Sequence, residues 1–188
     1  MNYTKKLSIG VDIDESICHL AQDILDILNN KNNTNHTLSD ITRYEFGKCI
    51  SVSDSDINYA VKKAIYSNPK PVEHASDVIN LLGSYGDIFF LTKRKHDERD
   101  VTIKLLKDIG IKTQYALFTE CDKPAVINRL SIDYMIEDRA KHAEDIAFGT
   151  NCTTLLLDRP WNRHAAIHSR ILRVFDWKDI MIYFLGKI

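Results

Sequence analysis

The chain has 188 residues, of which 44% are hydrophobic and 27% are charged. At roughly 150 residues per domain, this length predicts one globular domain, or one domain with a sizeable insertion, and the composition excludes a disordered or collagen-like chain. The 25 basic and 26 acidic residues leave a formal net charge of −1, so we expect no binding to a nucleic-acid polymer or to a membrane surface.

Short apolar runs that end in a polar residue recur along the chain and predict buried parallel strands. The clearest three end at Asp12, Thr92 and the pair Glu137 and Asp138. In chain order, the expected strands are Leu7–Val11, Ile88–Leu91, Tyr115–Phe118, Tyr134–Ile136, Thr153–Leu157 and the less apolar Ile171–Phe175.

Helical patterns separate these runs. Apolar residues recur at helical spacing from Ala75 to Leu82, from Asp97 to Ile109 and from Ala143 to Ala147, and a glycine follows each segment. Strands that alternate with helices predict an α/β fold, namely a doubly wound, Rossmann-like parallel sheet covered on both faces.

Roughly fifty-five residues lie between the first two core strands, far more than an ordinary connection needs, and they predict a small helical cap inserted after the first strand. Ile57–Ile65 has the pattern of an amphipathic helix, with Ser53 as its N-cap. Asn29–Asn35 has the composition of an exposed loop, and Asn68–Pro71 that of a hinge returning to the core. The predicted domains are a core of residues 1–16 and 73–188 and a cap of residues 17–72.

Polar residues follow the strands at the edge of the sheet where open α/β folds bind their ligands. Asp12 and Asp14 follow the first strand, Thr92 follows the second, and Glu137 and Asp138 end a later one. Four carboxylates at one edge repel one another unless a cation is present, and a ligand set made only of oxygen suits Mg²⁺. The sequence therefore predicts a magnesium site.

Magnesium held by carboxylates usually leaves positions for a substrate phosphate, which Lys123 and the Thr92 hydroxyl can help to bind. An aspartate can then attack phosphorus, because the metal and the lysine neutralise the charge that keeps two anions apart. A second carboxylate, two residues further on, can protonate the leaving oxygen. The pattern is typical of phosphoryl transfer.

These residues resemble, in order, the four motifs of the haloacid dehalogenase (HAD) phosphatases. The motifs are Asp12-Ile13-Asp14, Thr92, Lys123 and Glu137-Asp138-Arg139, each placed after or near a predicted strand. Within that superfamily, the stretches Leu38–Phe46 and Leu157–Asn162 look like the 5′(3′)-deoxyribonucleotidase branch, the 5′-nucleotidases of type C. The resemblance covers essentially the whole chain.

The resemblance implies a Mg²⁺-dependent enzyme with a capped Rossmann-like core that hydrolyses nucleoside monophosphates. It implies that Asp12 is the nucleophile and a metal ligand, and that Asp14 is the acid and base and binds the metal through its backbone carbonyl. The remaining implied roles are phosphate binding by Thr92 and Lys123, direct metal binding by Asp138 and water-mediated metal binding by Glu137.

Three positions depart from the pattern of this branch. Glu15 stands where the branch usually has glycine, Lys93 where a small residue is common, and Glu137 where aspartate is common. We expect Glu15, Lys93 and Arg94 to lie close to the path by which substrate enters. Lys93–Lys95 has the composition of a solvated charge cluster, in which Arg94 is the candidate for a further phosphate ligand.

Other positions allow two interpretations. Tyr44 and Phe46 are candidates for contact with the substrate base, but cap aromatics also form the core of a small domain. The carboxylates at strand ends can be turn residues or helix caps, and Lys123 can be a solvated charge at a helix start. Arg139, Arg159 and Trp161–Arg163 suggest a structural turn with solvated arginines, and the seven histidines show no ligand spacing.

Together these patterns predict a cytoplasmic Mg²⁺-dependent phosphomonoesterase that acts through an aspartyl-phosphate, and the family resemblance implies that its substrates are small-molecule nucleotides. Four cysteines without a CxxC motif, and an N-terminus without a signal-peptide pattern, favour the cytoplasm. The alternatives are a HAD phosphatase for another small phosphate such as a sugar phosphate, a phospho-accepting signalling domain, and a non-catalytic phosphate-binding protein. A homodimer is left open.

Overall fold

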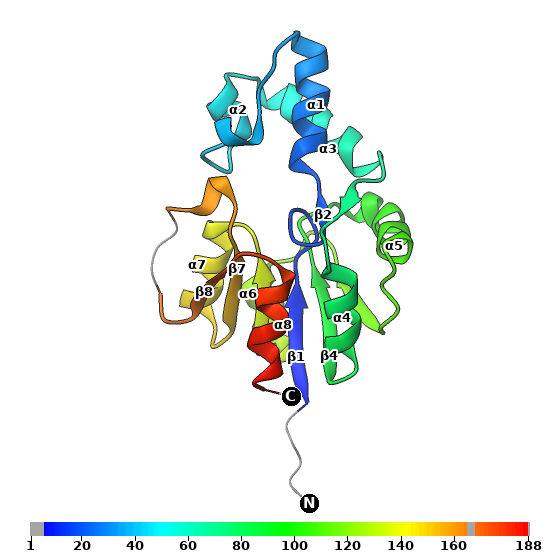
Figure 1. Ribbon diagram of the computed structural model, residues 1–188, viewed down its shortest axis with the longest axis vertical. Helices are drawn as coiled ribbons and strands as arrows, with labels where there is room; N and C mark the ends of the chain where they lie inside the picture. Colours follow the sequence, from blue (N-terminus) through cyan, green and yellow to red (C-terminus); the bar gives the residue numbers. More distant parts are fainter. Residues whose placement is uncertain (1–5, 165–167, 188) are drawn as a thin grey trace, which may run out of the picture.

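Six parallel strands form the central sheet of the structure, a computed structural model that describes residues 6–164 and 168–187 (Figure 1). The strand order is β5-β4-β1-β6-β7-β8, with all neighbours parallel. The strands are β1 (Leu7–Val11), β4 (Gly86–Leu91), β5 (Tyr115–Phe118), β6 (Tyr134–Glu137), β7 (Thr153–Leu157) and β8 (Ile171–Val174). The six expected strands are confirmed. Residues 1–5, 165–167 and 188 of the predicted core lie outside the described residues.

Helices cover both faces of this sheet, as the doubly wound fold requires. One face packs against α4 (Ala75–Gly83), α5 (Arg99–Asp108) and α8 (Trp177–Leu185), the other against α6 (Lys123–Leu130) and α7 (Ala140–Gly149). Successive strand residues belong to different clusters: Ile136 packs on the first face and Met135 on the second. In the described ranges, none of the helices has the length and apolar character that a membrane span needs.

The insertion between β1 and β4 is helical, as predicted, and has its own apolar cluster. Its elements are β2 (Cys18–His19), α1 (Ala21–Asn32), the short 3₁₀ helix η1 (Leu38–Asp40), α2 (Phe46–Ile50), α3 (Asp54–Ile65) and β3 (Lys70–Pro71). The two short strands pair antiparallel where the chain leaves and re-enters the core. Figure 1 shows the cap helices beyond the carboxyl end of β1, so they face the edge of the sheet that carries the polar motifs.

The predicted start of α3 is close to the observed one, because the Ser53 hydroxyl accepts a hydrogen bond from the Asp56 N–H at 3.2 Å. The predicted loop Asn29–Asn35 is wrong in its first half, because α1 continues to Asn32 and ends on Asn33 in a left-handed conformation. Buried Ile24, Leu25 and Leu28 hold this helix to the cap despite its asparagines.

The order of the strands reverses between β1 and β6. From β1 the chain proceeds outward to β4 and β5, then returns to place β6 on the opposite side of β1. In open α/β sheets, ligands bind beyond the carboxyl ends of the strands at such a reversal. Here Asp12 follows β1, and Glu137 and Asp138 end and follow β6, so the fold brings these carboxylates together.

Candidate active site

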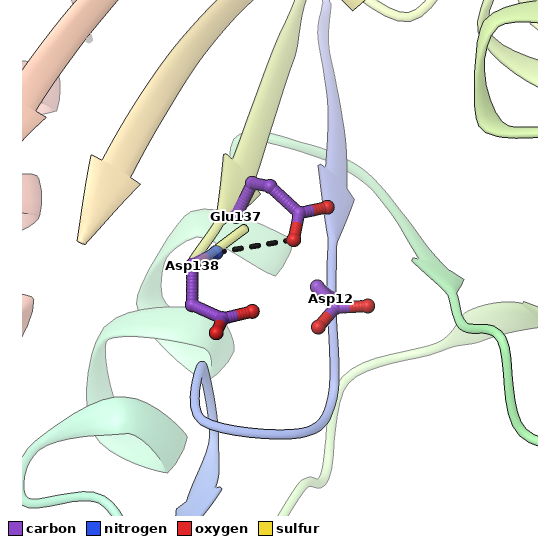
Figure 2. A group of neighbouring side chains, drawn as sticks. All are labelled: Asp12, Glu137 and Asp138. Atoms are coloured by element: carbon purple, nitrogen blue, oxygen red, sulfur yellow. Dashed lines mark hydrogen bonds between the residues drawn. The ribbon is translucent and has the colours of Figure 1, made fainter. Parts of the chain in front are cut away.

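Three buried carboxylates meet where β1 and β6 end. One oxygen each from Asp12, Glu137 and Asp138 lies within 4.8 Å of the others, and Figure 2 shows the side chains around a common space. The strand ladder continues one residue beyond β1, because the Asp12 N–H donates to the Ile136 carbonyl at 2.9 Å. That bond fixes the Asp12 backbone beside β6.

Lys123 supplies a cation to this cluster. Its Nζ donates to Asp12 Oδ1 at 2.5 Å and to Glu137 Oε2 at 2.6 Å, and only 2% of its side chain is exposed. Asp122 accepts the Ala125 N–H as the N-cap of α6, which begins at Lys123 and so places it against the sheet edge. The interpretation of Lys123 as a solvated charge is therefore wrong.

The charges of the cluster do not balance within the protein. Burial raises the pKa of Asp12 to about 7, and burial with the charges of Glu137 and Asp12 raises the pKa of Asp138 well above its usual value. Burial alone would lower the pKa of Lys123, but the Asp12 and Glu137 carboxylates raise it. The raised pKa values of Asp12 and Asp138 mean that the ionised cluster, with three carboxylates and one ammonium, is unfavourable without a further cation, and a bound cation would stabilise it.

The oxygen donors of the cluster fit Mg²⁺, which prefers carboxylate ligands. Glu137 is already engaged on both oxygens: Oε2 accepts from Lys123, and Oε1 accepts from the N–H groups of Asp138 and Arg139 at 3.1 and 3.0 Å. Glu137 therefore fixes the turn that precedes α7 (Ala140–Gly149) and does not cap the helix, whose N-cap Arg139 has no side-chain cap hydrogen bond, so the helix-cap interpretation is wrong for Glu137. Within the described ranges, Asp12 Oδ2 and Asp138 Oδ1 accept no hydrogen bond, which leaves them available to a cation.

Asp14 lies apart from the three carboxylates, paired with Arg94. The Arg94 Nη2 donates to Asp14 Oδ1 at 2.6 Å and Nε lies 3.1 and 3.2 Å from the two oxygens. Arg94 is only 3% exposed, and its Nη1 also donates to Thr102 Oγ1 at 3.2 Å. Arg94, the predicted phosphate ligand, is thus already paired with a carboxylate of the protein. The interpretation of Lys93–Lys95 as a solvated cluster is wrong for Arg94.

The residues that depart from the branch pattern all line the cleft, but in different ways. Glu15 has a left-handed φ of 60°, the conformation that explains a glycine there, and its Oε1 accepts from the N–H groups of Leu20 and Ala21 at the start of α1. Lys93 is exposed. Thr92 is buried, and its hydroxyl accepts from the Arg94 N–H at 3.1 Å.

A cleft of about 960 Å³ separates these groups from the cap. Both predicted cap aromatics line it: Tyr44 is 44% exposed, whereas Phe46 is 9% exposed and packs in the apolar cluster of the cap. The Arg139 guanidinium lies over the Tyr44 ring, with Cζ 3.8 Å from the ring centroid. Core and cap side chains therefore meet in this cleft.

Sequence reasoning missed three residues at the site. His142 Nδ1 lies 3.5 Å from Glu137 Oε2, because the first turn of α7 folds back over the end of β6. Trp161 donates its indole N–H to Asp138 Oδ2 at 2.9 Å, and Asn162 donates to the Asp138 carbonyl at 2.6 Å. The expected turn exists, but Arg159 is not solvated: its Nη2 donates to the Glu15 carbonyl at 2.5 Å.

Comparisons with known proteins indicate a nucleotidase. Residues 5–186 match the family described as 5′ nucleotidase, deoxy (pyrimidine), cytosolic type C protein. The chain is 28% identical over 181 residues to a nucleotidase of Clostridium acetobutylicum, covering 94% of this chain and 92% of that protein.

Solved structures share the fold. The protein YfnB of Bacillus subtilis, described as a HAD-hydrolase bound to magnesium, matches with a TM-score of 0.64 and 14% identity over 97% of this chain and 99% of that one. A haloacid dehalogenase-like hydrolase of Streptococcus pneumoniae matches with a TM-score of 0.61 and 12% identity over 95% and 98%. The chain has the fold of HAD hydrolases. It belongs to the type C family of 5′-nucleotidases, and it is a hydrolase of the nucleotidase and phosphatase class.

Proposed function

We propose that the protein is a Mg²⁺-dependent phosphomonoesterase of the cytoplasm that hydrolyses nucleoside or deoxynucleoside monophosphates through an aspartyl-phosphate on Asp12. The observation that carries this proposal is the placement of Asp12: it is buried, paired with Lys123, and faces a cleft beside Glu137 and Asp138. The family description and the Clostridium acetobutylicum relative support the nucleotidase activity.

In this proposal, Asp12 and Asp138 bind the metal through their carboxylates, Asp14 binds it through its backbone carbonyl, and Glu137 binds it through water. Bound Mg²⁺ would neutralise charge on the phosphate and on the carboxylates. YfnB, a protein of the same fold, is described as bound to magnesium, and the oxygen-only donor set here supports the same ion.

The chain's own residues supply the chemical steps. An Asp12 oxygen attacks phosphorus and the bond to the leaving oxygen breaks. Asp14 donates a proton to that oxygen, which requires Asp14 to be protonated and released from its ion pair with Arg94 before this step. Asp14 then takes a proton from water, which attacks phosphorus and breaks the bond to Asp12, releasing phosphate. Lys123 and Thr92 hold the phosphate, and Asp14, whose side chain is 29% exposed, is reached from the cleft.

The cap supports a nucleotide as substrate. An aromatic ring that is partly open to the cleft, as Tyr44 is, offers a face on which a base can stack, and Phe46 lines the same wall. Because the core groups bind only the phosphate, the cap residues select among different phosphate esters.

A phosphate-release panel tests the proposal. Ribo- and deoxynucleoside 5′- and 3′-monophosphates are compared with sugar phosphates, first after metal removal by a chelator and then with Mg²⁺ restored. We expect turnover of at least one nucleotide, greater than that of any sugar phosphate and dependent on Mg²⁺. Preference for a sugar phosphate would overturn the substrate assignment, and full turnover after chelation would overturn the metal requirement.

A further inference from the structure

The turn after β7, residues 158–162, has no role in the proposed function, although it contacts the site. Trp161, at its centre, is 2% exposed and contacts the site on one side and the cap on the other. Its indole N–H donates to Asp138 Oδ2 at 2.9 Å. This contact engages Oδ2, whereas Asp138 Oδ1 accepts no hydrogen bond from the described residues, so Oδ1 is the oxygen left available to a cation.

The ring of Trp161 belongs to the apolar cluster of the cap. It packs on Phe46 with ring centroids 5.7 Å apart and planes tilted by 52°. The other buried members of that cluster, within the described residues, all come from the segment 20–65. A side chain of the core is therefore built into the interior of the cap.

Hydrogen bonds on either side of Trp161 fix the turn to the rest of the core. The buried amide of Asn162 donates to the carbonyls of Asp138 and Leu157 at 2.6 and 2.7 Å, and its Oδ1 accepts from Arg173 at 2.7 Å. Arg159 donates to the carbonyl of Glu15, the residue that holds the start of α1. The turn thus joins the loop after β1, the end of β6 and strand β8.

We propose that Trp161 is a positioning residue that couples the cap to the metal ligand Asp138. The indole N–H holds Asp138 with one oxygen directed at the cluster, while the ring holds the cap through Phe46. Metal affinity and the packing of the cap are then linked, and the linkage is reciprocal. The proposal rests on the proposed function, because it requires a cation at the carboxylates.

Mg²⁺ binding to the substrate-free protein, measured by isothermal titration calorimetry, tests the coupling. Trp161→Phe keeps an aromatic ring and removes the N–H, so we expect the Kd for Mg²⁺ to rise about ten- to a hundredfold, the usual effect of removing a hydrogen bond to a metal ligand. The matched control is Trp177→Phe, which removes another buried indole N–H, the one donated to the Ser16 carbonyl at 2.8 Å. We expect its Kd to stay within about twofold of the wild type.

Two further variants test the cap side and the folded state. Phe46→Leu leaves the indole intact but changes the surface on which it rests, so we expect a smaller rise in the Kd for Mg²⁺, roughly threefold to tenfold. The Trp177→Phe protein retains Trp161 as its single tryptophan, and we expect its fluorescence to change when Mg²⁺ is added. This signal does not depend on whether Trp161→Phe folds.

The outcomes separate the two proposals. An unchanged Kd for Mg²⁺ in folded Trp161→Phe overturns the coupling, and so does fluorescence of Trp177→Phe that does not change when Mg²⁺ is added. Neither result affects the proposed nucleotidase activity of the wild type. An unchanged Kd in Phe46→Leu alone overturns the link to the cap. A wild-type protein that neither binds Mg²⁺ nor releases phosphate from nucleotides overturns the proposed function and the coupling together.

Discussion

The sheet edge of the core and the wall of the cap hold their polar and aromatic groups in opposite ways. At the sheet edge, Asp12 and Lys123 are buried and paired, and Thr92 is enclosed by backbone. In the cap wall, Tyr44 is open to the cleft. Groups that stabilise a transition state must be oriented before the reaction, whereas groups that select a leaving group need only contact it when the substrate binds. This difference supports the division of roles in the proposed function, with the chemistry in the core and the selection of substrate in the cap.

The largest expected effect comes from the nucleophile. Asp12→Asn should lower kcat for every phosphate ester by more than about a thousandfold, because an amide does not form the bond to phosphorus. The Asn carbonyl can still accept from Lys123, so we expect the thermal unfolding midpoint to change little. Turnover above a few per cent of the wild type, measured by phosphate release, would contradict the role of Asp12.

Asp14→Asn should separate substrates by their leaving group. Loss of a proton donor costs about 10²–10⁴ in rate for a nucleotide, whose sugar oxygen leaves poorly without a proton. The loss on p-nitrophenyl phosphate should be much smaller, because nitrophenolate leaves readily. If kcat falls equally on both substrates, Asp14 does not protonate the leaving oxygen and serves the site through its pairing with Arg94 instead.

Replacement of the buried Lys123 tests how its ammonium group stabilises the folded core. Lys123→Met leaves Asp12 and Glu137 together without their shared ammonium, which should lower the free energy of unfolding by about 3–5 kcal/mol. Added Mg²⁺ should restore part of that loss, because it supplies charge to the same carboxylates. The matched control is the exposed Lys93 of the same cleft: Lys93→Met should change stability by less than about 0.5 kcal/mol in urea unfolding.

The sequence predicts the sheet edge well because its signals are local. Parallel strands buried on both faces are continuous apolar runs, so the polar residue that ends each run, such as Asp12 or Thr92, is visible without knowledge of the fold. The order of the motifs then indicates the family. The burial of Lys123 is not visible, because a lysine at a helix start has the same local pattern whether it faces water or a carboxylate.

Pairings between distant segments could not be predicted. Asp14 and Arg94 lie eighty residues apart, and no local pattern distinguishes an arginine that binds phosphate from one that holds a carboxylate. The same is true of Trp161 and Asp138, which come from turns after different strands. The end of helix α1 could not be predicted, because its asparagines are typical of a loop. The packing of Leu25 and Leu28 in the cap stabilises the helix there.

The cap should show a smaller and more selective effect than the core. If a base stacks on Tyr44, Tyr44→Ala removes about 1–3 kcal/mol of binding, and kcat/KM for nucleotides should fall roughly tenfold to a hundredfold. We expect p-nitrophenyl phosphate hydrolysis to change less than about twofold, because that substrate has no base. Tyr44→Phe keeps the stacking face and should behave nearly as the wild type. Equal losses on both substrates would place Tyr44 in the framework of the cap through its contact with Arg139, and base selection would then have to come from elsewhere in the cleft.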